Sequence, residues 1–224
     1  MSKIIFTLLL CFILSGCSRS ETPSVLPESE SMQPQTVETE LTAVRIDDFS
    51  EYYELFDASG EERNWYHAAL GCLFSAPEEI DLNFMFYLGT GGGSWDAISE
   101  QSRQYLLYKE FMWEMDLQVM PVMVLDEILM NTLGISINDV SIPDEWEYIE
   151  YEHAYCSNHN DAYFPDPITI TSVTEYSDGT VEILYTVDYF YDTRSDRLYE
   201  NPSMMLKLFR SESDNWHIRS NTIG

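Results

Sequence analysis

Basic residues are scarce in this chain of 224 residues, with 11 Lys and Arg against 39 Asp and Glu and a formal net charge of −28. A surface this negative repels the phosphates of DNA and RNA, so we expect no nucleic-acid partner. The same field attracts divalent cations and basic partners. Hydrophobic residues nevertheless make up 45% of the chain and aromatic residues 14%, which is enough for a folded body.

Motifs of well-known enzymes are also lacking. The sequence contains no G-x-S-x-G, H-E-x-x-H or C-x-x-C. Its glycine-rich stretch, residues 89–94, lacks the G-K-[ST] ending of a phosphate-binding loop and is interpreted as an ordinary loop. The sequence therefore gives no direct indication of catalysis.

No apolar run reaches the roughly 20 residues that a membrane-spanning helix needs. The run Ile4–Ile13 follows Lys3 and leads into Leu14-Ser15-Gly16-Cys17. A positive residue, an apolar run and small residues before a cysteine resemble the signal of a bacterial lipoprotein. The resemblance implies that residues 1–16 are a signal peptide and that Cys17 carries lipid. It also implies a protein anchored to the extracytoplasmic face of the cell membrane.

The segment after Cys17 has the composition of a tether. Residues 17–40 are rich in Ser, Thr, Pro, Glu and Gln and show no apolar periodicity, so we expect them to be disordered. Residues 41–224 then form a single α+β domain, which divides into a helical part, 41–140, and a β-rich part, 141–224.

Helical periodicity dominates the first half of this body. We expect helices around 47–56, from residue 61 to Pro77, over 99–112 and over 121–133, the last with Gly134 just past its end. Short strands are expected at 42–46 and 115–119. These helices are expected to cover one face of a C-terminal sheet.

In the second half, apolar residues recur at every second position. An antiparallel meander of about five strands is therefore expected there. Asp178-Gly179 indicates a hairpin turn between strands 168–176 and 180–191, and further strands are expected at 146–155, 204–209 and 216–219. Val181, Ile183, Tyr185, Val187, Tyr189 and Tyr191 are predicted to share one face. The last hairpin resembles those of NTF2-like and cystatin-like folds, and the body is similar to uncharacterised Gram-positive surface lipoproteins.

Two cysteines remain in the body, Cys72 and Cys156. An extracytoplasmic setting permits a disulfide between them, and two separate buried thiols are the alternative.

Metal sites are suggested by one short region. His153, Cys156 and His159 have a spacing that could serve zinc, although a strand would place Cys156 on the opposite face from the histidines. Asn158, Asn160, Asp161 and Asp166 offer the oxygen ligands that calcium prefers, without the order of an EF-hand loop. No other cofactor is expected.

Acidic residues are interleaved with aromatic residues over residues 144–152. Trp146, Tyr148 and Tyr151 are candidate contacts for a ligand, with Tyr189 and Tyr191 as a second group. We therefore expect a non-enzymatic domain that binds a protein or glycan partner. The alternatives are a glycan-acting hydrolase using a pair among Glu145, Glu147, Glu150 and Glu152, or a calcium-dependent binding module.

Overall fold

The computed structural model describes residues 41–60, 63–87, 89–90, 93–111, 117–158 and 166–224. Residues Glu40–Gly224 form one compact unit. Short helices precede an antiparallel sheet along the chain, so the expected α+β class is confirmed.

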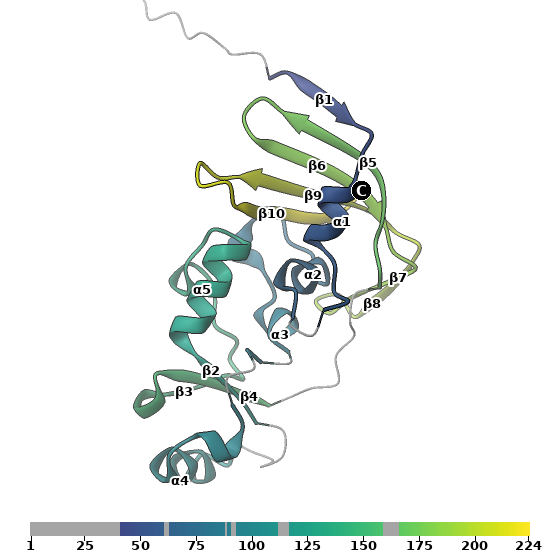
Figure 1. The fold of residues 1–224 in the computed structure, drawn as a ribbon. Helices are drawn as coiled ribbons and strands as arrows, with labels where there is room; N and C mark the ends of the chain where they lie inside the picture. Colours follow the sequence, from purple (N-terminus) through teal and green to yellow (C-terminus); the bar gives the residue numbers. More distant parts are fainter. Residues whose placement is uncertain (1–40, 61–62, 88, 91–92, 112–116, 159–165) are drawn as a thin grey trace, which may run out of the picture. The chain divides into compact units, whose positions relative to one another are not determined.

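The larger sheet has five strands in the order β1-β5-β6-β9-β10, all antiparallel to their neighbours (Figure 1). Its strands are β1 (Ala43–Ile46), β5 (Thr169–Tyr176), β6 (Thr180–Thr186), β9 (Ser203–Arg210) and β10 (Trp216–Ile223). The predicted turn between β5 and β6 is present, and Gly179 adopts φ +85° there, a conformation open to glycine without strain.

Helices pack against one face of this sheet. They are α1 (Ser50–Leu55), α2 (Trp65–Leu70), α3 (Leu82–Met85) and α5 (Val122–Thr132). Asn64 and Asp81 accept hydrogen bonds from the first-turn amides of α2 and α3, which sets where these helices begin. Leu70 and Leu129 of the helices share one hydrophobic cluster with the alternating inward residues of the sheet: Val181, Ile183, Tyr185, Leu206, Leu208 and Ile218.

Asn221 links the sheet to the end of α2. This residue is fully buried on β10, and its side-chain amide donates to the carbonyl oxygens of Leu70 and Cys72 at 3.0 and 2.9 Å. Its Oδ1 accepts the Tyr185 hydroxyl at 2.9 Å. One polar side chain therefore satisfies three buried groups from two layers of the fold.

A second, three-stranded sheet has the order β2-β4-β3, with β2 (Leu117–Pro121), β3 (Glu147–Ile149) and β4 (Ala154–Asn158). One face carries Met120, which belongs to the main cluster, and Tyr155, which packs against it. The other face carries Val119, Ile149 and Cys156, which form a second cluster with Leu106 of α4 (Glu100–Tyr108). The small sheet therefore lies between α4 and the main core.

The structure corrects three expectations about strands. Residues 146–155 form no single strand of the larger sheet, because the chain reverses within them. The shared face of β6 holds only as far as Val187, since Tyr189 is exposed and Phe190 is buried. Strand β7 (Tyr189–Asp192) instead pairs with β8 (Arg197–Glu200) in a separate two-stranded sheet.

The expected division into helical and β-rich parts is not followed, because β1 and β2 of the first half pair with strands of the second half. Two predicted helices are also shorter than expected. The second predicted helix ends at Leu70, before Pro77, and the third spans only Glu100–Tyr108.

Candidate functional site

The acidic and aromatic segment forms a β-hairpin. Strand β3 ends at Ile149, Glu150–Glu152 make one 3₁₀ turn, and β4 begins at Ala154, which pairs with Ile149. The reversal is completed by His153 at φ 47° and ψ 46°, a left-handed conformation that non-glycine residues adopt infrequently. The hairpin therefore has a defined turn, which presents the residues between the two strands.

Trp146 lies in the core and does not form part of an exposed surface. Its ring is 7% exposed and packs against Phe86 and Tyr155, with ring centroids 6.3 and 6.0 Å away. Its Nε1–H donates to Asn83 Oδ1 at 2.6 Å. Asn83 in turn donates through Nδ2 to Glu145. This candidate contact therefore anchors the start of the hairpin to α3.

Tyr148 and Tyr151 are exposed, with 40% and 63% of their surface accessible. The Tyr148 ring lies 5.2 Å from the ring of its cross-strand partner Tyr155, and its hydroxyl is 3.1 Å from His153 Nδ1. The His153 carbonyl accepts the amide of Val122, the first residue of α5. The next residue of this helix, Met123, is also exposed. We call Tyr148, Tyr151 and His153 the hairpin surface.

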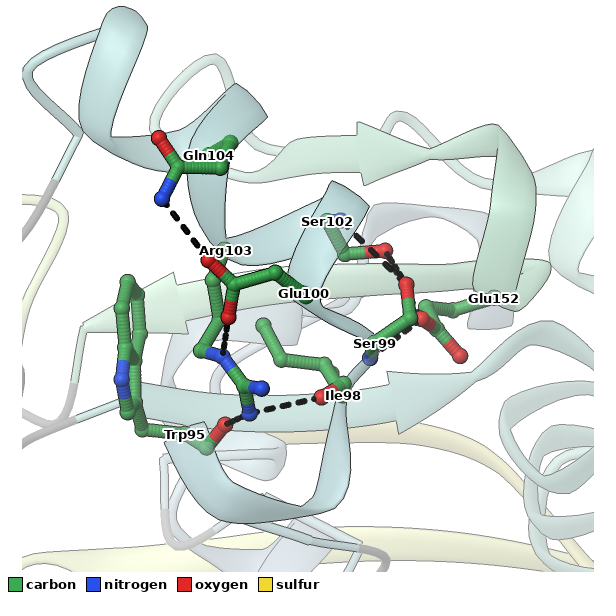
Figure 2. A network of polar contacts seen from close by, with 8 residues as sticks. All are labelled: Trp95, Ile98, Ser99, Glu100, Ser102, Arg103, Gln104 and Glu152. Atoms are coloured by element: carbon green, nitrogen blue, oxygen red, sulfur yellow. Dashed lines mark hydrogen bonds and ion pairs between the residues drawn. The ribbon is translucent and has the colours of Figure 1, made fainter.

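Glu152 holds the hairpin turn to the start of α4, as Figure 2 shows. Its Oε1 accepts the Ser99 amide at 2.8 Å and the buried Ser102 hydroxyl at 2.7 Å. Ser99 also caps α4, because its Oγ accepts the Ser102 amide at 3.2 Å. A carboxylate at a helix N-terminus satisfies free amides there and interacts favourably with the helix dipole. These hydrogen bonds lower the pKa of Glu152, the Ser99 amide contributing most.

Arg103 ties the same turn of α4 to the segment before it (Figure 2). Its guanidinium donates to the carbonyl oxygens of Ile98 and Trp95, at 2.9 and 3.4 Å, and pairs with Glu100 at 3.1 Å. The start of α4, which Glu152 contacts, is thereby also held by Arg103. The exposed Tyr151 lies next to this anchored carboxylate in the chain.

Replacing Glu152 with Gln should destabilise the chain by about 1 kcal/mol at pH 7, because a neutral acceptor replaces a charged one. Since folding lowers the Glu152 pKa below its ordinary 4.5, its contribution is present above that pH and is lost as pH falls through the folded value. Urea unfolding should therefore show a difference between the two proteins that shrinks from pH 7 to pH 3. The matched control is Glu150→Gln, at an exposed neighbour. An equal effect of both changes would contradict the assigned role.

Three of the four glutamates considered for a hydrolase contact different partners. Glu147 meets the last turn of α4, where it accepts the Tyr105 hydroxyl and pairs with Lys109 at 3.2 Å. Glu152 meets the first turn of the same helix, and Glu145 contacts α3. A general acid also needs a raised pKa, whereas that of Glu152 is lowered. The geometry of these carboxylates gives the hydrolase alternative no support.

No protein-family model, curated protein or solved structure matches this chain. The function of the hairpin surface must therefore be argued from its own geometry and chemistry. In the part of the chain that the structure describes, no helix is both long and apolar enough to cross a membrane. The lipidation candidate Cys17, the signal peptide and the tether lie outside the described residues.

The disulfide that the sequence permits is not formed. Cys72 and Cys156 are both buried free thiols, which corresponds to the alternative considered from the sequence. Cys72 lies in the main cluster and Cys156 in the cluster beneath α4, so packing separates them. Burial raises the pKa of both thiols, that of Cys156 to about 12, which keeps them protonated and unreactive at neutral pH.

The metal candidates are only partly described. Asn158 donates through Nδ2 to the Phe111 carbonyl at 3.2 Å, whereas its buried Oδ1 accepts no hydrogen bond from the residues that the structure describes. Asp166 accepts the Tyr189 amide at 3.2 Å. Asn160, Asp161 and His159 lie outside the described residues. Within the described ranges, no three His, Cys, Asp or Glu residues are grouped so that they could hold a metal ion.

Several residues of the site had not been singled out from the sequence. The hairpin is fixed by Ser102 and Tyr105 on α4, by Ser99 just before this helix and by Asn83 on α3, all of which lie far from it in the chain. The only local signal was a serine at the expected start of a helix, which is typical of a cap. Tyr189 and Tyr191 belong to β7, on a different sheet from the hairpin surface.

Proposed function

We propose that this chain is a non-enzymatic surface lipoprotein, anchored through Cys17, whose body binds an extracytoplasmic glycan at the hairpin surface. The observation that carries the proposal is the exposure of Tyr148 and Tyr151 on a hairpin whose turn Glu152 fixes to α4. Fixed aromatic rings lose little conformational entropy when a ligand binds, so they make effective contact residues.

The chemistry around the rings favours a glycan without negative charge. Tyrosine faces can pack against the apolar faces of sugar rings, and the exposed Glu150 beside Tyr151 can accept hydrogen bonds from hydroxyl groups. The net charge of −28 disfavours anionic polymers. Neutral and amino-sugar polymers of a cell wall or of the surroundings are therefore the proposed ligand class.

Retention of the full chain on insoluble chitin, in nonionic detergent, tests this proposal. We expect Tyr148→Ala and Tyr151→Ala each to weaken binding about tenfold or more, because exposed aromatic anchors often contribute 1–2 kcal/mol or more. Unfolding free energies should change by less than about 1 kcal/mol, since neither ring is buried.

Tyr189→Ala is the matched control, because this tyrosine has 48% of its surface exposed but lies on β7. It should leave retention unchanged. Retention that survives the Tyr148→Ala/Tyr151→Ala double change, or that falls equally in the control, would refute the hairpin surface as the binding site.

A calcium-dependent form of the same function has one supporting observation, the buried Asn158 Oδ1, which accepts no hydrogen bond within the described part of the chain. An amide oxygen without a donor is a suitable ligand for a hard cation. Adding EDTA to the retention assay should then abolish binding, and calcium should restore it. If EDTA has no effect, binding by the hairpin surface is independent of calcium.

A further inference from the structure

The two edge strands of the five-stranded sheet, β1 and β10, differ in the contacts that their outer backbone groups make. On β10, the amide and carbonyl of Asn221 both pair with Phe74 at 2.9 Å, and the Tyr66 hydroxyl donates to the Trp216 carbonyl at 2.8 Å. On the other edge, β1 pairs with β5 alone among residues 41–224 that the structure describes. Figure 1 shows β1 as the last strand on its side of the sheet.

The register shows which backbone groups of β1 face outward. Ala43 lies opposite Tyr176, so Thr42 lies opposite Ser177, and the Ser177 amide donates to the Thr42 carbonyl at 3.0 Å. Hydrogen-bonded pairs recur at every second residue of an antiparallel ladder. The amides of Val44 and Ile46 therefore face β5, whereas the amides and carbonyls of Ala43 and Arg45 face away from the sheet.

This edge carries few of the features that usually block strand addition. Its register has no bulge from Ala43 to Ile46, and the strand contains no proline. Val44 is 54% exposed and Leu41 just before the strand is 55% exposed. An added strand would cover this apolar surface as well as pair with the free backbone groups.

The negative charges near β1 favour an added strand with positive charge. Asp47 and Asp48 follow β1 directly, and Glu51 and Glu54 lie on α1, all four of them exposed, whereas β1 itself has only Arg45. A second copy of this chain would bring a further net charge of −28 to the same place. A segment with lysine or arginine side chains would instead be attracted.

We propose that the outer edge of β1 binds an extended, basic segment of a partner protein by adding it as a strand to the five-stranded sheet. Backbone hydrogen bonds to Ala43 and Arg45 hold the segment. Contact with Val44 and attraction to the surrounding carboxylates select it. This surface is independent of the hairpin surface and of the glycan proposed there.

The test uses the full chain in nonionic detergent and the capped peptide Lys-Val-Lys-Val-Lys-Val. In the free protein, NMR should show fast amide hydrogen exchange at Ala43 and Arg45 and slow exchange at Val44 and Ile46. The peptide should slow exchange at Ala43 and Arg45 tenfold or more. Its counterpart Glu-Val-Glu-Val-Glu-Val, and the lysine peptide with every backbone amide methylated, should have no effect.

Ala43→Pro removes one outward amide while keeping the ladder to β5, since that amide takes no part in it. Peptide affinity should fall at least tenfold, whereas Ala43→Val should retain it. Slow exchange at Ala43 and Arg45 in the free protein would overturn the proposal, because the chain itself or a second copy would then occupy the edge. Equal binding of the methylated peptide would also overturn it, even if the proline variant failed to fold.

Discussion

Replacing Cys17 with Ser is expected to move the protein from the membrane fraction to the soluble fraction of cells. A diacylglyceryl group and a second acyl chain together give stable anchoring, because each buried CH₂ contributes about 0.8 kcal/mol, and serine cannot form the thioether. We expect no second attachment through the body, since a net charge of −28 repels anionic lipid head groups. Incorporation of labelled palmitate should fall to background in the same variant.

Cys11→Ser is the matched control, because Cys11 lies inside the apolar run and should leave with the signal peptide. This variant should remain in the membrane fraction and keep its lipid. A Cys17→Ser protein that stays membrane-bound after a high-salt wash would refute lipidation at this residue. Release of both variants would point to a defect in export.

Replacing Asn221 with Ala should give the largest loss of stability of any single change considered. The Leu70 and Cys72 carbonyls and the Tyr185 hydroxyl would all lose their buried partner. Each such group costs about 1–3 kcal/mol, so we expect a total of about 3–5 kcal/mol in urea unfolding. A loss of this size is comparable with the whole stability of many domains.

Tyr185→Phe tests one of the three hydrogen bonds that the Asn221 side chain makes. It removes only the hydroxyl, so it should cost about 1 kcal/mol while both carbonyls keep their donor. Equal losses of unfolding free energy in Asn221→Ala and Tyr185→Phe would contradict the role of Asn221 as the link between sheet and helices. Near-native stability of the Asn221 variant would contradict it more strongly.

The elements with clear local signals were predictable from the sequence. Strand β6 alternates buried and partly buried residues, and the Asp178-Gly179 turn before it has the composition of a tight hairpin. Helix α5 is bounded by Pro121 and by Gly134, which adopts φ +71°. In these places local preference and tertiary packing agree, so a periodic pattern was sufficient.

The candidate site was predictable in composition but not in arrangement. The alternation changes phase between Tyr148 and Ile149, an irregularity that did not by itself predict a reversal of the chain at Glu150. Trp146 is buried by packing against Phe86 and Tyr155, and its indole N–H donates to Asn83, 63 residues earlier. The partners of Glu147 and Glu152 likewise lie on α4. Contacts between distant segments decided which aromatic rings are exposed.

The central claim, a tethered binding body on the outer face of the membrane, is tested most directly by the intact mass of the protein extracted from native membranes. The account predicts a chain that begins at Cys17 and carries the added mass of a diacylglyceryl group, usually with a further acyl group on its new amino terminus. A chain that retains residues 1–16, or one that begins elsewhere without lipid, would contradict it.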